Sequence, residues 1–168
     1  GGYGQRYGAD TSPQGSEFLV NTQTTNDQQA PAVTGLSDGG FVVTWMSRNQ
    51  DGDQFGIYGQ RYDIDGAATG NEFLVNTYTK DTQQSPAVVG LSDGGFLIAW
   101  HGAPDDGYGF GIHGQRYGAD GSAQGTQFLI NSNTNGYQYN PSIAASADGG
   151  FVVTWQSGQS QDGSDWGI

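Results

Sequence analysis

The hydrophobic and polar positions of the chain follow the pattern of short β-strands, with no stretch of helical period. Residues 57–63 place alternate side chains on two faces, with the period of two that strands show. Residues 72–77 are rich in strand-favouring types, and residues 86–91 open with a proline, which a strand accepts at its first position. Residues 96–100 are apolar throughout, which predicts a strand covered on both faces. Glycine-containing turns separate these runs, so this part of the chain predicts four strands.

The same four strands recur three times along the chain, at a constant spacing of 55 residues. Each unit contains, in order, G-Q-R-Y, F-L-[VI]-N-[TS], a proline-led segment and D-G-G-F-[VL]-[VI]-[TA]-W. We assign the units to residues 1–55, 56–110 and 111–168 of one domain. A repeat of this length without a helix predicts an all-β architecture of tandem four-stranded antiparallel units of the β-propeller-blade type. A linear stack of the same sheets and a closed three-fold barrel are the alternatives.

Three sequence signatures carry a resemblance to a known class of repeats. D-G-G-F-V-V-T-W, Q-D-G-x-x-[FW]-G-I-[YH]-G-Q-R-Y and F-L-V-N-T together cover the whole chain. They resemble the β-propeller-type repeats of large secreted, RTX-associated bacterial surface proteins. The resemblance implies secretion or a surface location, an adhesive or structural role, and an association with calcium. The calcium-binding nonapeptide G-G-x-G-x-D-x-U-x itself does not occur in the chain.

The two ends of the chain fall at matching points of the repeat. The last unit stops at Ile168, which corresponds to Ile57 and Ile112, and the first unit begins just before Tyr3. Tyr3 of a second copy could therefore follow Ile168 in register. We expect head-to-tail self-association, because unfilled strand edges favour pairing with another chain. Two chains of three units would give a six-bladed ring, and a rotation that does not close would give a filament.

The composition excludes two classes of partner. The chain has 17 Asp and Glu against 5 Lys and Arg, a net charge of −12, whereas nucleic acid and anionic membranes both require a basic face. There is no cysteine, so disulfides and thiolate metal sites are excluded. No apolar run approaches the roughly 18 residues of a membrane span. We expect an extracellular or cell-surface protein with no nucleic-acid partner and no membrane insertion.

Two residue types recur at one position of every unit and are predicted to be structural. An arginine follows Gly-Gln in the first strand, where it would pair with a carboxylate or backbone carbonyls of its own or the next unit. A tryptophan ends the most apolar strand, where core packing is the better interpretation. The alternatives are an anion-binding fork for the arginines and sugar stacking for the tryptophans. These positions are Arg6, Arg61, Arg116, Trp45, Trp100 and Trp155.

The loops that join neighbouring units hold the candidates for binding. Each carries acids in a glycine-rich setting with few cations, and Ca²⁺ takes several carboxylate and carbonyl oxygens as ligands. The candidate calcium ligands are Asp51, Asp53, Asp105, Asp106, Asp162 and Asp165, with ordinary Asp-Gly turns as the alternative. One aromatic residue in each loop, held on a rigid scaffold, could stack on a sugar ring. These residues are Phe55, Phe110 and Trp166.

Catalytic motifs do not appear in the sequence. His101 and His113 are the only histidines, neither recurs in the other units, and no G-x-S-x-G, H-E-x-x-H or P-loop string is present. Equivalent acids in every loop are more typical of architecture than of a glycosidase pair. We therefore expect a non-enzymatic structural or adhesive module that binds copies of itself. The alternative function is a carbohydrate-binding lectin, in which equivalent sites between units combine weak affinities for glycans.

Overall fold

The computed structural model describes residues 1–103, 109–158 and 166–167, which form strands and turns and contain no helix. No described segment is therefore a helix that could cross a membrane. The all-β class is confirmed. The strands are β1 (Tyr3–Tyr7), β2 (Pro13–Leu19), β3 (Gln28–Gly35), β4 (Phe41–Arg48), β5 (Phe55–Tyr62), β6 (Ala68–Leu74), β7 (Gln83–Gly90), β8 (Phe96–Gly102), β9 (Gly111–Tyr117), β10 (Ala123–Leu129), β11 (Gln138–Ala145), β12 (Phe151–Gly158) and β13 (Trp166–Gly167).

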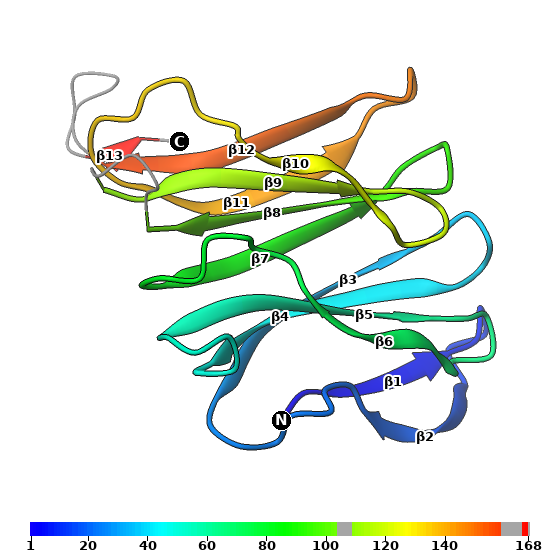
Figure 1. Ribbon diagram of the computed structural model, residues 1–168. Coiled ribbons are helices and arrows are strands. Elements are labelled where there is room, and N and C mark those ends of the chain that lie inside the picture. Colours follow the sequence, from blue (N-terminus) through cyan, green and yellow to red (C-terminus); the bar gives the residue numbers. More distant parts are fainter. Residues whose placement is uncertain (104–108, 159–165, 168) are drawn as a thin grey trace.

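These strands form four antiparallel sheets that follow one another along the chain (Figure 1). β1 and β2 make a two-stranded sheet, β3-β4-β5-β6 and β7-β8-β9-β10 make four-stranded sheets, and β11-β12-β13 make a three-stranded sheet. Successive sheets pack on one another, with β3 against β7 and β7 against β11. The first strand, β1, and the last strand, β13, lie at opposite ends of this array.

The sheets are out of step with the sequence units. The proline-led and D-G-G-F strands of one unit pair with the G-Q-R-Y and F-L-V-N strands of the next. β4 and β5 pair over their full length, from Phe41 opposite Tyr62 to Arg48 opposite Phe55. The junction between two units is therefore a hairpin within one sheet. Two complete sheets result, flanked by the two strands β1 and β2 at one end and by β11-β12-β13 at the other.

Side-chain hydrogen bonds and a bulge move two strand boundaries away from the predicted positions. β6 ends at Leu74, whereas the sequence predicts a strand over 72–77. Asn76 lies outside the strand, where its Oδ1 accepts the N–H of Ile57 at 2.6 Å and its Nδ2 donates to a backbone carbonyl. β7 begins before Pro86 instead of at it, because a β-bulge with a positive φ of 51° at Ser85 accommodates the proline.

The core lies between the two complete sheets. Every residue of β8 is buried, which confirms the strand predicted from residues 96–100. Its Phe96, Ile98 and Trp100 pack in one cluster with Val42 and Ile57 of the preceding sheet. Both faces of β8 are apolar, so this strand is buried only because sheets stack on either side of it.

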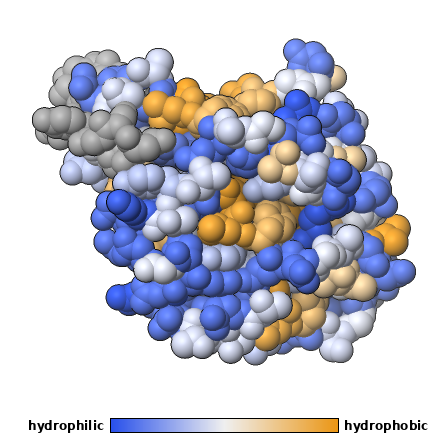
Figure 2. All heavy atoms as spheres, viewed as in Figure 1, coloured by the Kyte–Doolittle hydropathy of each residue, from blue (hydrophilic) through white to orange (hydrophobic). Residues whose placement is uncertain are grey.

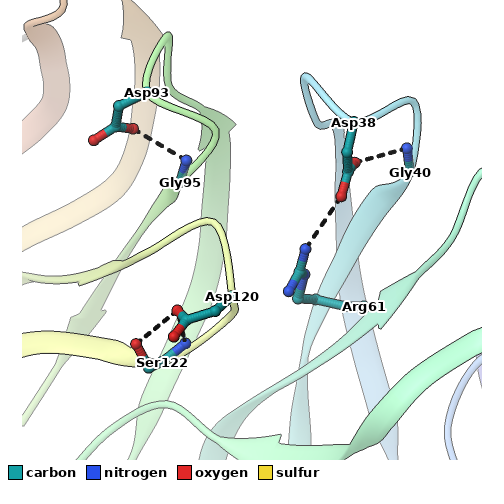
Figure 3. A network of polar contacts seen from close by, with 7 residues as sticks. All are labelled: Asp38, Gly40, Arg61, Asp93, Gly95, Asp120 and Ser122. Atoms are coloured by element: carbon teal, nitrogen blue, oxygen red, sulfur yellow. Dashed lines mark hydrogen bonds and ion pairs between the residues drawn. The ribbon is translucent and has the colours of Figure 1, made fainter.

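Aspartate side chains close the D-G-G hairpins. Asp38 Oδ1 accepts the N–H of Gly40 at 2.9 Å, and Asp93 Oδ1 accepts the N–H of Gly95 at 3.0 Å (Figure 3). The glycine between them takes a positive φ, 87° at Gly94, which a residue without a Cβ adopts readily. The motif therefore specifies a turn that brings two strands of one sheet together.

Gly95→Ala is expected to destabilise the fold by about 1–3 kcal/mol. A Cβ on Gly95 would lie 2.3 Å from the carbonyl oxygen of Tyr117, which belongs to the backbone of the paired strand β9. Urea unfolding measures the loss as a lower midpoint. Gly35→Ala is the matched control, because open space surrounds its Cβ position. Equal midpoints for Gly95→Ala and the parent would contradict this packing.

Candidate functional site

An apolar groove of about 350 Å³ lies between the N-terminal sheet and the sheet β3–β6. β1 forms one wall, and β3 with β4 forms the other. None of the residues that line it, all within the described part of the chain, is Asp, Glu, His or Cys. Side chains on the walls include Tyr3, Phe18, Val20, Val33, Phe41 and Trp45. The groove is therefore suited to apolar groups rather than to a metal cation.

The groove exists because β1 has a strand partner on one edge only. Among the described strands β1 pairs with β2 alone, whereas its counterpart β5 pairs with both β4 and β6. Tyr58 and Tyr62 of β5 are each 6% exposed, but the equivalent Tyr3 and Tyr7 of β1 are 71% and 65% exposed. A strand paired with the free edge of β1 would therefore cover most of the exposed surface of these two tyrosine side chains.

Tyr62 shows what a covered tyrosine of this strand does. Its hydroxyl donates to the carbonyl of Val20 at 2.9 Å, and its ring stacks on Phe41 with centroids 4.7 Å apart. Burial, and then the charge of Glu72, raise the pKa of Tyr62 to about 12, so the phenol stays neutral. The same position in a complete sheet is thus dry, stacked and hydrogen-bonded.

At the other end of the array, β12 also has an edge that is mostly unpaired among the described residues. It pairs with β11 along one edge, but on the other edge β13 reaches only its last two residues. Phe151 and Val152 are 39% and 57% exposed, whereas the equivalent Phe96 and Leu97 of β8 are fully buried. Figure 2 shows hydrophobic surface over β12 at one end of the array and near β2 at the other. The molecule therefore has an incompletely covered strand at each end.

The repeated arginines join neighbouring parts of the molecule. Arg6 donates to the backbone carbonyls of Ile64 and Asp65, in the β5–β6 turn of the following sheet. Arg61 makes an ion pair with Asp38 at 3.4 Å and also lies beside the β9–β10 turn (Figure 3). Asp120 in that turn has its pKa lowered, first by its hydrogen bonds to Ser122 and last by Arg61.

Arg116 pairs with Asp93 of its own sheet.

The tryptophans differ in how completely they are covered. Trp45 and Trp100 are buried, and Trp100 stacks on His113 with centroids 5.9 Å apart. Trp155 is only half-buried, and neither described residue of β13 pairs with it.

The loop aromatics do not share one environment. Phe55 packs against the main core cluster, whereas Phe110 lies among other aromatic rings, with Tyr137 at 5.7 Å and Tyr139 at 5.5 Å. Trp166 belongs to β13. Phe55 and Phe110 are therefore not equivalent in their surroundings. Sugar stacking by the loop aromatics stays a prediction.

Two of the six acids predicted to bind calcium lie in the described part of the chain. Asp53 Oδ2 accepts the N–H of Asp81 at 2.9 Å, and Asp51 Oδ2 accepts a bond from Asn76 at 3.4 Å. No group of three or more His, Cys, Asp or Glu side chains among the described residues is placed to hold a metal ion. Asp105, Asp106, Asp162 and Asp165 lie outside the described residues. Calcium binding stays a prediction.

No protein-family model and no curated protein matches the chain. It is similar in structure to the endo-arabinase from Bacteroides thetaiotaomicron VPI-5482, with a TM-score of 0.55 and 15% identity over 81% of this chain and 53% of that one. A protein of unknown function from Dyadobacter fermentans DSM 18053 gives 0.58 and 17% over 83% and 49%. The alpha-L-arabinofuranosidase from Lactobacillus brevis gives 0.56 and 12% over 92% and 51%. The likeness shows a propeller-type all-β fold, and the chain spans about half the length of each neighbour.

The comparison corrects one expectation from the sequence. The absence of catalytic motifs predicted a protein that is not an enzyme, and this inference is wrong, because two of the structural neighbours are an endo-arabinase and an alpha-L-arabinofuranosidase. Short motifs such as G-x-S-x-G mark particular catalytic folds, and a propeller-type enzyme need not contain any of them. The absence of these motifs is therefore not evidence against enzymatic activity.

Neither the groove nor the cluster of rings around Phe110 was predicted from the sequence. A pattern of identical units does not predict the groove, because the groove depends on how the strands are grouped into sheets at the ends of the array. The rings had a readable signal, because Tyr137 and Tyr139 stand where the middle unit has Thr82 and Gln84. In a repeat, the positions that break the pattern are the ones that architecture does not explain.

Proposed function

We propose that the chain is a structural or adhesive module that assembles head to tail with copies of itself by β-strand addition. β12 of one copy would pair with the free edge of β1 of another. β11, β12, β1 and β2 would then form a four-stranded sheet in the order of β3-β4-β5-β6. The observation that carries the proposal is the pair of complementary edges, each with exposed apolar side chains that are buried in the complete sheets.

The β4–β5 pair supplies the register for this joint sheet. Phe41 lies opposite Tyr62, and their rings stack at 4.7 Å. The equivalent residues are Phe151 of one copy and Tyr7 of the other, so the same register would stack these two rings. The joint sheet would also bury the apolar side chains that line the groove. Burial of apolar surface is the principal driving force for such a contact.

The propeller-type fold of the structural neighbours supports a closed form of this assembly. Two copies joined at both ends would contain four complete and two joint sheets, a number within the usual range of propellers. A rotation per sheet that does not close would make the same contact propagate into a filament. We place this role outside the cell or at its surface, in keeping with the acidic, glycine-rich composition.

Sedimentation velocity at micromolar concentration tests the proposal. We expect the parent chain to sediment as a species of at least twice 17.7 kDa. Val33→Asp should return it to a monomer, because Val33 is exposed on the groove wall and its equivalent Val88 packs against the core in a complete interface. Ile64→Asp, at an equally exposed position outside the groove lining, should leave the assembly intact. A parent that sediments at 17.7 kDa would overturn the proposal.

Gly150→Ala tests whether the joint sheet has the proposed register. Gly150 is equivalent to Gly95, but within one chain the atom nearest to its Cβ position is the Ser146 hydroxyl at 2.9 Å, which can rotate away. In the joint sheet the added methyl group would meet the carbonyl of Tyr7 of the second copy instead. The variant should therefore fold but fail to assemble. Unimpaired assembly of Gly150→Ala would show that the contact lies elsewhere.

A further inference from the structure

Three residues, one in β8 and two near the start of β11, differ from their equivalents in the other units and lie close together in the structure. Each other unit carries different residues at these positions, so the shared architecture does not require them. All three gather around Phe110, whose equivalent Phe55 packs into the core instead. The three residues are His101, where the other units have Met46 and Gln156; Tyr137, where they have Asp27 and Thr82; and Tyr139, where they have Gln29 and Gln84.

The rings form a compact cluster with an exposed side. Tyr137 and Tyr139 are nearly parallel, with centroids 5.8 Å apart and an interplanar angle of 9°. Phe110 meets both edge-on, at angles of 75° and 81°. Tyr137 is 42% exposed, so part of the cluster faces solvent. We call Phe110, Tyr137 and Tyr139 the aromatic platform.

His101 supports the platform from below. It is buried, its ring meets Tyr139 edge-on with centroids 5.2 Å apart, and its Nδ1 accepts the N–H of Asn140 at 3.3 Å. Burial lowers the pKa of His101 to about 4, so the imidazole is neutral at physiological pH. The platform thus rests on a fixed, uncharged ring, and its orientation does not depend on a mobile side chain.

Two amide side chains lie next to Tyr139. Asn140 follows it in the chain, and Gln156 is opposite it in the β11–β12 ladder. Asn140 Nδ2 donates to Gln156 Oε1 at 3.0 Å. This bond leaves the Asn140 Oδ1 as an acceptor and the Gln156 Nε2 as a donor, since neither atom has a hydrogen bond to the described residues. Both residues are exposed, so these groups are accessible to a ligand.

We propose that the aromatic platform and the Asn140–Gln156 amide pair bind the ring of a neutral sugar. Aromatic faces pack against the C–H face of a sugar ring, and amides pair with its hydroxyl groups. A neutral sugar is favoured over an acidic one, because the chain has a net charge of −12 and no arginine or lysine belongs to the cluster. The inference goes beyond the proposed assembly and does not rest on it, because the ring contacts and the Asn140–Gln156 bond all form within one chain. Tyr139, Asn140 and Gln156 belong to β11 and β12, but none of them lines the groove.

An array of immobilised neutral pentose and hexose oligosaccharides, with acidic oligosaccharides beside them, tests this site. The parent should bind at least one neutral glycan. The double variant Tyr137→Thr, Tyr139→Gln should lose roughly tenfold or more in affinity, since it gives up two stacking rings. Tyr137→Phe, which keeps the ring, should retain binding. The double variant carries the residues of the middle unit, and its circular dichroism should match that of the parent.

The outcomes are separable from those of the assembly experiment. The double variant should sediment like the parent, and Val33→Asp should bind glycans like the parent. If the double variant fails to fold, Tyr137→Thr alone replaces it, because this side chain is partly exposed. Absence of binding to every neutral glycan would overturn the inference. So would glycan binding that survives both tyrosine substitutions.

Discussion

Trp100→Ala is expected to lower the free energy of unfolding by about 3–5 kcal/mol. Trp100 is fully buried, and it packs with Phe96, Ile98 and Ile57 between the two complete sheets. The loss combines the transfer free energy of the indole with the cost of the cavity that it leaves. This cavity cannot close easily, because its neighbours belong to sheets whose backbones are already paired on both edges.

Denaturant unfolding of the parent and the variant measures this loss. Ile64→Ala is the control for a large apolar side chain removed from an exposed position, and it should change stability by about 0.5 kcal/mol or less. Trp155→Ala should fall between the two, because Trp155 holds the same position in the repeat but is only half-buried. A Trp100→Ala protein as stable as Ile64→Ala would mean that the tryptophan is not part of the core.

The strands could be predicted from the sequence because their signals are local. The apolar run at residues 96–100 and the alternation at 57–63 correspond to β8 and β5, and the D-G-G turns follow from bonds between neighbouring residues. The end of β6 could not be predicted in this way. Asn76 reads as part of a strand, but it bonds to the backbone of Ile57, 19 residues away in the chain.

The grouping of strands into sheets could not be predicted either. A tandem repeat reads the same from any starting point, so the sequence alone does not say where a sheet begins. The hairpin between β4 and β5 joins two units, and only its cross-strand contacts, such as Phe41 on Tyr62, reveal that they form one sheet. The groove follows directly from this grouping, because β1 then lacks the partner that β5 has in β4.

The candidate site was obscured by the repeats for a related reason. Recurrence drew attention to arginines and tryptophans that hold sheets together, and to Asp51 and Asp53, whose carboxylates accept hydrogen bonds from Asn76 and Asp81. Tyr137 and Tyr139 do not recur, and they come together with Phe110 only through the packing of β11 on β8 and β9. A contact of this kind is tertiary, and no spacing within one unit encodes it.

Stability is expected to fall by up to about 3 kcal/mol as the pH drops from 6.5 to 4, because of His101 alone. Burial holds the pKa of His101 at about 4 in the folded chain, whereas an unfolded histidine titrates near 6.5. Between these values the unfolded state binds a proton that the folded state does not. The contribution of His101 is therefore complete above about pH 6.5 and is lost progressively as the pH falls toward 4.

His101→Met isolates this contribution, because Met46 holds the same position in the preceding unit. Denaturant midpoints of the parent and of His101→Met, taken at one protein concentration between about pH 7 and pH 4.5, should diverge in slope, with the parent falling and the variant nearly level. His113 is present in both proteins, so its effect cancels in the comparison. Asp10, Asp120 and Asp148 have their pKa values lowered below 3.8, chiefly by hydrogen bonds from neighbouring serines, and titrate below this window. Parallel curves for the two proteins would mean that His101 is accessible to protons in the folded chain, and then it could not be the fixed neutral support of the aromatic platform.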